Sequence, residues 1–247
     1  MIDTEPTDWR DLQNKVAAIL HESGLQVKRE HTVHTARGHV EIDVYAEDVS
    51  SRLTLIYFCE CKHWQNAVPQ TIVHGFRTIM SDFGAHIGFI ISSNDFQKGA
   101  FEAAQHSNVQ LLTWHKFQEL FVGRWLQRYL SPKVNAEVSP LIEYTETFNS
   151  RIIRKAKIFN EEQSKQFAVL REKYAMIATS TALLCHTLPF YKGDGLLTYA
   201  PPAIRDSFKQ SPMTLDHAGS LRILFENWSE FLRCALSEFD QLFGERA

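Results

Sequence analysis

Two stretches of the chain decide its fold: residues 40–46 read VEIDVYA, and residues 53–62 read LTLIYFCECK. Both are rich in β-branched and aromatic residues and are bounded by polar turns, which is the pattern of β-strands. A third stretch of this kind lies at residues 25–33. The three together predict consecutive strands joined as an antiparallel meander.

Four charged side chains interrupt two of these apolar strands in pairs. Because alternate side chains of a strand share a face, Glu41 and Asp43 are expected to point one way from the first strand. The same rule places Glu60 and Lys62 on one face of the second strand. Charges inside apolar strands are costly unless they pair with each other or hold a metal ion. The pattern predicts a charged site across two strands.

The flanking sequence completes a mixed order of helices and strands. Helical spacing of apolar residues predicts helices at residues 8–22, 72–80, 98–106 and 114–130, and short apolar runs predict strands at residues 87–91 and 109–112. This order predicts an α/β fold, a mixed-sheet sandwich, for a first domain of residues 1–130.

The second half of the chain differs in character. Two prolines and small polar residues predict a linker at residues 131–140. Long helical patterns follow at residues 160–186 and 215–243, joined by a loop that contains glycines and prolines. We therefore predict an α-helical domain at residues 141–247, whose apolar stripes fit a bundle or a dimer seam equally well.

Composition limits the classes of partner. The formal net charge is −3, so the basic surplus usual in proteins that bind nucleic acid is absent. A local basic patch, repetition in an oligomer or a metal ion would have to supply the affinity. No apolar run approaches the ~18–20 residues that span a bilayer, and the polar start does not look like a signal peptide. The expected location is the cytoplasm, with no membrane partner.

The charged site has the chemistry of a phosphodiester hydrolase. Carboxylates such as Asp43 and Glu60 are hard oxygen ligands, which suit Mg²⁺ or Mn²⁺ and leave coordination positions for phosphate and water. Such an ion polarises a phosphate and lowers the pKa of bound water. Lys62 would then stabilise the negative charge that develops in the transition state.

Asp43, followed after a hairpin by Glu60-Cys61-Lys62, resembles the signature of the PD-(D/E)xK nuclease superfamily. The likeness is closest to the Mrr-like restriction endonucleases and covers about residues 8–122. It implies a restriction-endonuclease-like fold, Asp43 and Glu60 as metal ligands, and Lys62 as a catalytic residue. It also implies a catalytic role for Gln70, which matches a glutamine common in that family on the helix after the lysine strand.

Three further residues are candidates for supporting roles. Many relatives have a glutamate on the opening helix where this chain has Gln13, which can bind a metal water but adds no charge. Glu41 is a candidate to compensate for that missing charge. His63 lies next to the proposed site in sequence and could touch phosphate or carry a proton. A zinc site of Cys59, Cys61 and His63 is the less favoured interpretation, because the two cysteines share the face of a strand expected to be buried.

The sequence thus predicts an Mg²⁺-dependent endodeoxyribonuclease, with a role in restriction or anti-phage defence implied by the resemblance. Two alternatives stay open at this point. One is a structure-specific or RNA-directed nuclease of the same fold. The other is a catalytically silent protein that binds nucleic acid or acts as a scaffold. The helical half has no recognisable motif, and we hypothesise that it forms a homo-oligomer, recruits a partner protein or senses a trigger.

Overall fold

The computed structural model describes residues 1–187 and 220–244 of the chain. It divides into two compact units, Met1–Arg128 and Tyr129–Ala247. The loop predicted after residue 186, and the start of the helix predicted at residues 215–243, lie outside the described residues.

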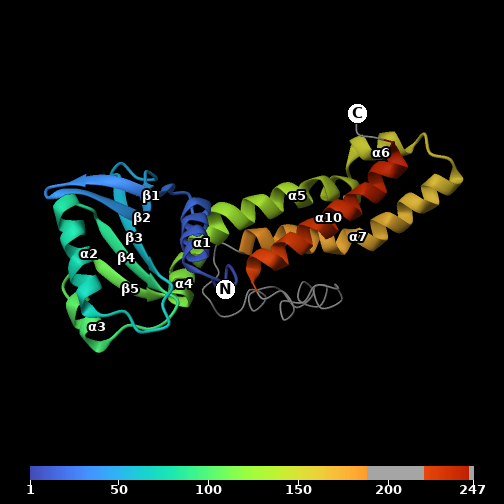
Figure 1. The fold of residues 1–247 in the computed structure, drawn as a ribbon. Coiled ribbons are helices and arrows are strands. Elements are labelled where there is room, and N and C mark those ends of the chain that lie inside the picture. The colour runs from blue at the N-terminus through green and yellow to red at the C-terminus, as the bar shows by residue number, and fades with distance from the viewer. Residues whose placement is uncertain (188–219, 245–247) are drawn as a thin grey trace. The chain divides into compact units, whose positions relative to one another are not determined.

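The first unit is built on a five-stranded sheet whose strands lie side by side in chain order (Figure 1). The strands are β1 (Gln26–Thr35), β2 (Gly38–Asp48), β3 (Leu55–Lys62), β4 (Ile87–Ser92) and β5 (Val109–Thr113). β1, β2 and β3 pair in antiparallel fashion, whereas β3, β4 and β5 are parallel. The predicted mixed-sheet α/β fold is confirmed.

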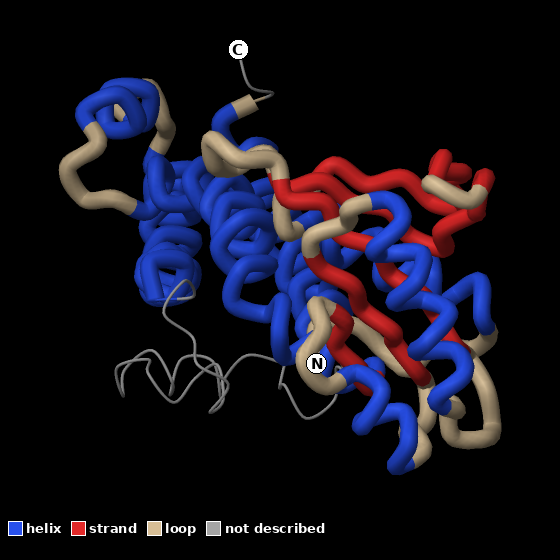
Figure 2. Tube along the Cα trace, turned by 90° about the vertical axis from the view of Figure 1, so that its left-hand side faces the viewer, coloured by secondary structure: helices blue, strands red, loops and turns tan. Residues whose placement is uncertain are grey.

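Helices cover both faces of this sheet. They are α1 (Trp9–Glu22), α2 (Gln70–Phe83), α3 (Lys98–Ala104) and α4 (Trp114–Trp125). On one face, apolar side chains of α2 and α3 form a buried core with Phe58 and Ile90 of the sheet. On the other face, Phe89 of β4 contacts Phe117 and Phe121 of α4 edge to face. Figure 2 shows helices lying across the strands, which are drawn in red.

The alternation of side chains along β2 is broken at Asp43. Ile42 and Tyr45 belong to the same buried core, although residues three apart in a regular strand point to opposite faces. The pairing of β1 with β2 omits the Glu30–Asp43 pair, and Glu30 has a left-handed backbone with φ +48°. The expectation that Glu41 and Asp43 follow a regular alternation is therefore wrong, because the strand is distorted at this point.

The second unit is helical among its described residues. The π-helix η1 (Leu126–Leu130) lies at the boundary, followed by α5 (Ser131–Thr145), α6 (Ser150–Ala156), α7 (Glu161–Thr187) and α10 (Leu221–Phe243). α5, α7 and α10 lie side by side (Figure 1) and enclose an apolar core. In this core Tyr144 of α5 stacks on Phe239 of α10, with the ring centroids 4.9 Å apart.

The predicted linker at residues 131–140 is instead the first part of α5. Pro132 lies in the first turn of this helix, where a backbone N–H has no partner inside the helix anyway. Pro140 lies within the helix, and buried side chains on both sides of it, Val138 and Leu141, pack into the core of the unit. Packing of this apolar face thus outweighs the cost of an internal proline. Among the described residues, no helix has both the length and the apolar character needed to cross a membrane.

Candidate active site

Glu60 and Lys62 lie at the carboxyl end of β3, in the middle of the sheet. The Lys62 ammonium is 2.5 Å from Glu60 Oε1, and the two side chains are only 17% and 22% exposed, respectively. The backbone here is fixed, since β3 pairs with β4 through Lys62 and Ser92, and the Ser93 N–H donates to the Lys62 carbonyl at 3.1 Å. The predicted sharing of one strand face by these two side chains holds.

Asp43 reaches the same place from β2. The regular pairing of β2 with β3 ends at Val44 and Cys59. The next part of β3 is bonded differently, because the Cys61 N–H donates to Asp43 Oδ2 at 2.7 Å. The Asp43 carboxylate therefore takes the position that a backbone carbonyl would occupy in a longer ladder. The distortion of β2 thus brings Asp43 beside the Glu60-Cys61-Lys62 segment.

The two carboxylates affect each other. Burial raises the pKa of Glu60, the negative charge of Asp43 raises it further, and the Lys62 ammonium counteracts both. A cation placed between the carboxylates would relieve their repulsion. Two neighbouring hard oxygen donors fit Mg²⁺ or Mn²⁺, which complete their coordination with water and phosphate oxygens.

The described part of the chain offers no larger protein cage for a metal. Within residues 1–187 and 220–244, no group of three or more His, Cys, Asp or Glu side chains is arranged to hold an ion. The cysteines of β3, Cys59 and Cys61, are buried, and burial raises the pKa of both thiols.

The other predicted site residues have contacts and surroundings of their own. Gln13 is buried on α1, and Glu41 is exposed on β2. Gln70, the first residue of α2, places its amide against α3, where its Oε1 would lie 2.6 Å from a Cβ added at Gly99. His63 is half-buried, and its Nε2 is 3.3 Å from the Pro6 carbonyl. No hydrogen bond or ion pair among the described residues joins these four to Asp43, Glu60 or Lys62.

The sequence analysis did not single out one aromatic residue of this site. The Lys62 ammonium lies 5.3 Å from the centroid of the Trp64 ring. Such a contact is within the range of a cation–π interaction. Strand periodicity could not have indicated it, because β3 ends at Lys62 and Trp64 lies in the loop that follows.

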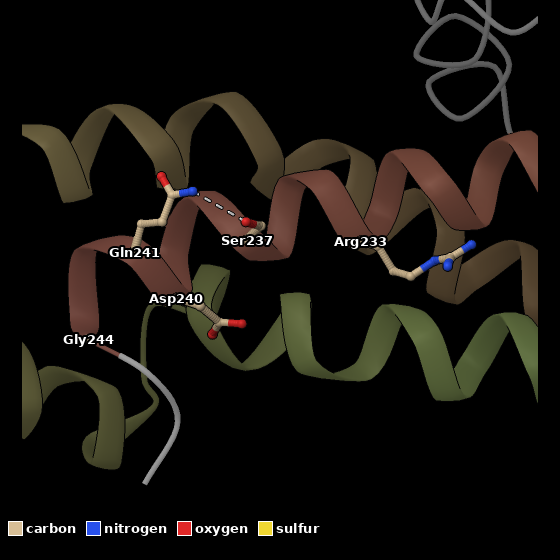
Figure 3. Close-up of a pocket in the computed structure, with 5 residues that line it drawn as sticks. All are labelled: Arg233, Ser237, Asp240, Gln241 and Gly244. Atoms are coloured by element: carbon tan, nitrogen blue, oxygen red, sulfur yellow. Dashed lines mark hydrogen bonds between the residues drawn. The ribbon is translucent and has the colours of Figure 1, made fainter.

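The second unit has a pocket along α10. It has a volume of about 440 Å³ and is lined by Arg233, Ser237, Asp240, Gln241 and Gly244, all from α10 or its end. In Figure 3 the Gln241 amide donates to the Ser237 hydroxyl, at 3.5 Å, while the Arg233 side chain points away from that pair. None of the predicted catalytic residues lines it.

A comparison with models of protein families finds a match that lies within the first unit. Residues 4–121 match the family model of the restriction endonuclease catalytic domain of the Mrr type. No curated protein matches the chain.

Two solved structures show a distant likeness. A protein of unknown function, AF1548, is 14% identical with a TM-score of 0.39, and the match covers 74% of this chain and 99% of that protein. The MspJI restriction endonuclease, solved with a 27-mer oligonucleotide, is 17% identical with a TM-score of 0.31, and the match covers 48% of this chain and 27% of MspJI. At these scores neither likeness carries weight for the chemistry. The residues that match the model of the Mrr-type restriction endonucleases include Asp43, Glu60 and Lys62.

Proposed function

We propose that the first unit is a metal-dependent endonuclease that hydrolyses phosphodiester bonds of DNA. The observation that carries the proposal is that Asp43, Glu60 and Lys62 meet at the end of β3. The Lys62 ammonium is 2.5 Å from the Glu60 carboxylate, and the Asp43 carboxylate accepts a hydrogen bond from the backbone N–H of Cys61, which lies between them in sequence. The family match of residues 4–121 supports nuclease chemistry.

In this proposal Asp43 and Glu60 hold Mg²⁺ or Mn²⁺. A bound ion would supply a Lewis acid for the phosphate and would lower the pKa of a coordinated water. Hydrolysis replaces one P–O ester bond with a bond from phosphorus to a water oxygen, and the proton that the water loses balances the one that the leaving oxygen takes up. Lys62 donates to the phosphate oxygens and stabilises the charge that builds up on them, an effect that is strong in a partly buried site.

DNA is the proposed substrate because the matched family consists of restriction endonucleases, and a role in restriction or anti-phage defence follows from the same match. One structural observation favours a second candidate. Gln13, which is buried on α1, takes the place of a glutamate that many members of the resembled family have, so this position adds no negative charge to hold an ion. A chain that binds nucleic acid without cutting it is therefore the alternative.

The deciding experiment is cleavage of supercoiled plasmid by the purified chain with Mg²⁺, with Mn²⁺ and with EDTA. The Lys62→Ala variant is compared with Lys98→Ala, which removes a lysine that is 93% exposed on α3. We expect nicking or linearisation that requires metal, survives Lys98→Ala and falls at least about a hundredfold in Lys62→Ala, which is the size typical of a lost transition-state donor.

Four outcomes would count against the proposal or a part of it. Cleavage that persists in EDTA would show that no metal ion is required. Equal activity of the two lysine variants would show that Lys62 has no catalytic role. DNA binding without cleavage in either metal would favour the silent alternative. Faster cleavage of RNA than of DNA would show that RNA is the preferred substrate, and it would leave the proposed roles of the site residues unchanged.

A further inference from the structure

The loop after β3 places an exposed indole beside the active-site lysine. Trp64 is 41% exposed, whereas the Lys62 side chain is 17% exposed. The Lys62 ammonium is within reach of two partners, the Glu60 carboxylate at 2.5 Å and the Trp64 ring, whose centroid is 5.3 Å away. The lysine thus has one charged partner and one uncharged partner.

This loop is held in place by its backbone and not by burial of the indole. The Asn94 side chain donates to the Gln65 carbonyl at 2.5 Å, and the Val68 N–H donates to the Asp95 carbonyl at 3.0 Å. A bridge between Val68 and Phe96 extends the pairing of the two loops. The backbone that follows Trp64 is therefore held in place, while the Trp64 side chain stays partly exposed.

The proposed function affects the two partners of Lys62 differently, because Glu60 is a proposed metal ligand and Trp64 is not. A divalent cation bound to Glu60 repels the Lys62 ammonium, which lies 2.5 Å from Glu60 Oε1. Cation binding therefore weakens the pairing of Lys62 with Glu60, and a partly buried ammonium with no other partner is costly. The ring of Trp64 is uncharged, does not compete for the cation and remains in reach.

We propose that Trp64 is a positioning residue, which keeps the Lys62 ammonium at the site after a divalent cation has taken Glu60. Lys62 then exchanges Glu60 for the scissile phosphate without swinging into solvent. This inference rests on the proposed function. The inference extends the proposed function, because it assigns a role to a residue other than Asp43, Glu60 and Lys62.

The kinetic test compares Trp64→Leu and Trp64→Phe with Trp9→Leu. Trp9 is a matched control, because it is 48% exposed and has the Arg10 guanidinium 4.9 Å from its ring centroid. We expect kcat for plasmid cleavage to fall about threefold to tenfold in Trp64→Leu, as loss of a cation–π contact predicts. The fall should leave KM nearly unchanged, recover largely in Trp64→Phe and be absent in Trp9→Leu.

A second readout does not depend on cleavage. The ε-methylene protons of Lys62, assigned by their loss in Lys62→Arg, should resonate upfield in the wild type because of the indole ring current. Their chemical shift should return to the value usual for lysine in Trp64→Leu. It should stay upfield when Mg²⁺ is added to the wild type.

Several results would overturn the inference. They are unchanged Lys62 resonances in Trp64→Leu, loss of the upfield shift when Mg²⁺ binds, or an effect of Trp64→Leu that appears only in KM, which would indicate a contact with the DNA bases. If the wild type does not cleave DNA at all, the proposed function fails. In that case the resonance of Lys62 with and without Mg²⁺ still decides whether Trp64 holds the ammonium.

Discussion

Asp43 serves the structure and the proposed chemistry with the same carboxylate, and two substitutions separate the roles. In Asp43→Asn the amide oxygen can still accept the Cys61 N–H, which Asp43 Oδ2 accepts at 2.7 Å in the wild type. The negative charge for a metal ion is lost. We expect thermal unfolding close to that of the wild type and a fall in cleavage of at least about a hundredfold.

Asp43→Ala is the companion variant, because it removes the acceptor as well. The Cys61 N–H is then left without its partner, which costs about 1–3 kcal/mol of the free energy of unfolding. If Asp43→Asn were as unstable as Asp43→Ala, the charge and not the hydrogen bond would hold the two strands here. Urea titration of both variants gives the comparison.

Asp48, at the end of β2, couples the stability of the first unit to pH. The Arg124 guanidinium lies 2.5 Å from Asp48 Oδ2, and its hydrogen bond holds the pKa of that carboxyl well below its usual range. A carboxyl whose folded pKa is lowered adds stability above its unfolded pKa of about 3.9, and that stability is lost as pH falls towards the folded pKa.

We therefore expect the melting temperature of the wild type to fall more steeply below about pH 4 than that of Asp48→Asn, since 3.9 is the ordinary Asp pKa. At pH 7 the Asn variant should be less stable by about 1–3 kcal/mol, because Arg124 loses its charged partner. Differential scanning calorimetry at pH 7 and pH 3 measures both effects. Parallel pH profiles of the two proteins would contradict the prediction.

At the scale of single residues, the sequence predicted the charged group better than its surroundings. Asp43, Glu60 and Lys62 were predictable because a charge in an apolar strand is costly and therefore conspicuous. The contact of Trp64 with Lys62 depends on the conformation of the loop after the strand, which no periodicity encodes. For Gln70, the helix position was predictable, whereas the direction of its amide towards α3 was not.

At the scale of elements, the packing of α2 on β4 depends on a glycine. A Cβ at Gly88 would lie 2.8 Å from Cε1 of Phe76 and 3.0 Å from the sulfur of Met80. Both of these side chains are buried on α2. We expect Gly88→Ala to lower the free energy of unfolding by about 1–3 kcal/mol, as overpacking of a filled core does.

Gly75 provides the matched control for that substitution. It lies within α2, and a Cβ there would have no atom within 4 Å. Gly75→Ala should therefore raise the free energy of unfolding by about 0.5–1 kcal/mol, through the higher helix propensity of alanine. Denaturant titration of the two variants tests the opposite signs. Two changes of the same sign would show that the close approach at β4 can be relieved by small movements.

The elements themselves were largely predictable, and the errors have physical causes. The strands and helices of the first unit start and end within a few residues of their predicted limits, because apolar periodicity follows directly from which face is buried. The linker at residues 131–140 was wrong, since a proline in a first helical turn and a proline in a loop look alike in sequence. The distortion of β2 at Asp43 was hidden, because it depends on the conformation of Glu30 on the neighbouring strand.

At the scale of the whole molecule, each unit has a core of its own. The core around Phe58 contains only residues of the first unit, and the core around Phe239 contains only residues of the second. The second unit also exposes large apolar side chains at seven-residue intervals on α7, namely Val169, Met176 and Leu183. This spacing is typical of a seam between paired helices.

We propose that the second unit brings copies of the chain together, which would compensate for a net charge of −3 by multiplying the contacts with DNA. Met176→Glu should then lower the mass measured by light scattering and slow plasmid cleavage at equal protein concentration. Met176→Leu, which keeps the apolar stripe, should change neither.

Residues 1–128 produced alone provide the complementary comparison. We expect this unit to fold, because the core around Phe58 lies entirely within it, and to cut more slowly than the full chain. An isolated first unit that cuts as fast as the whole protein would contradict an auxiliary role of the helices. Full-length protein that is monomeric at all concentrations would contradict the seam.

The broken alternation at Asp43 also limits how this protein can vary in length. An insertion or deletion in the turn between β1 and β2 leaves the paired residues in place and changes only a surface loop. Loss or gain of one residue between Ile42 and Tyr45 would instead restore or shift the alternation and turn Asp43 away from the Cys61 N–H. Functional copies of this domain should therefore tolerate changes of length at the tip of this hairpin, while the spacing from Ile42 to Tyr45 stays fixed.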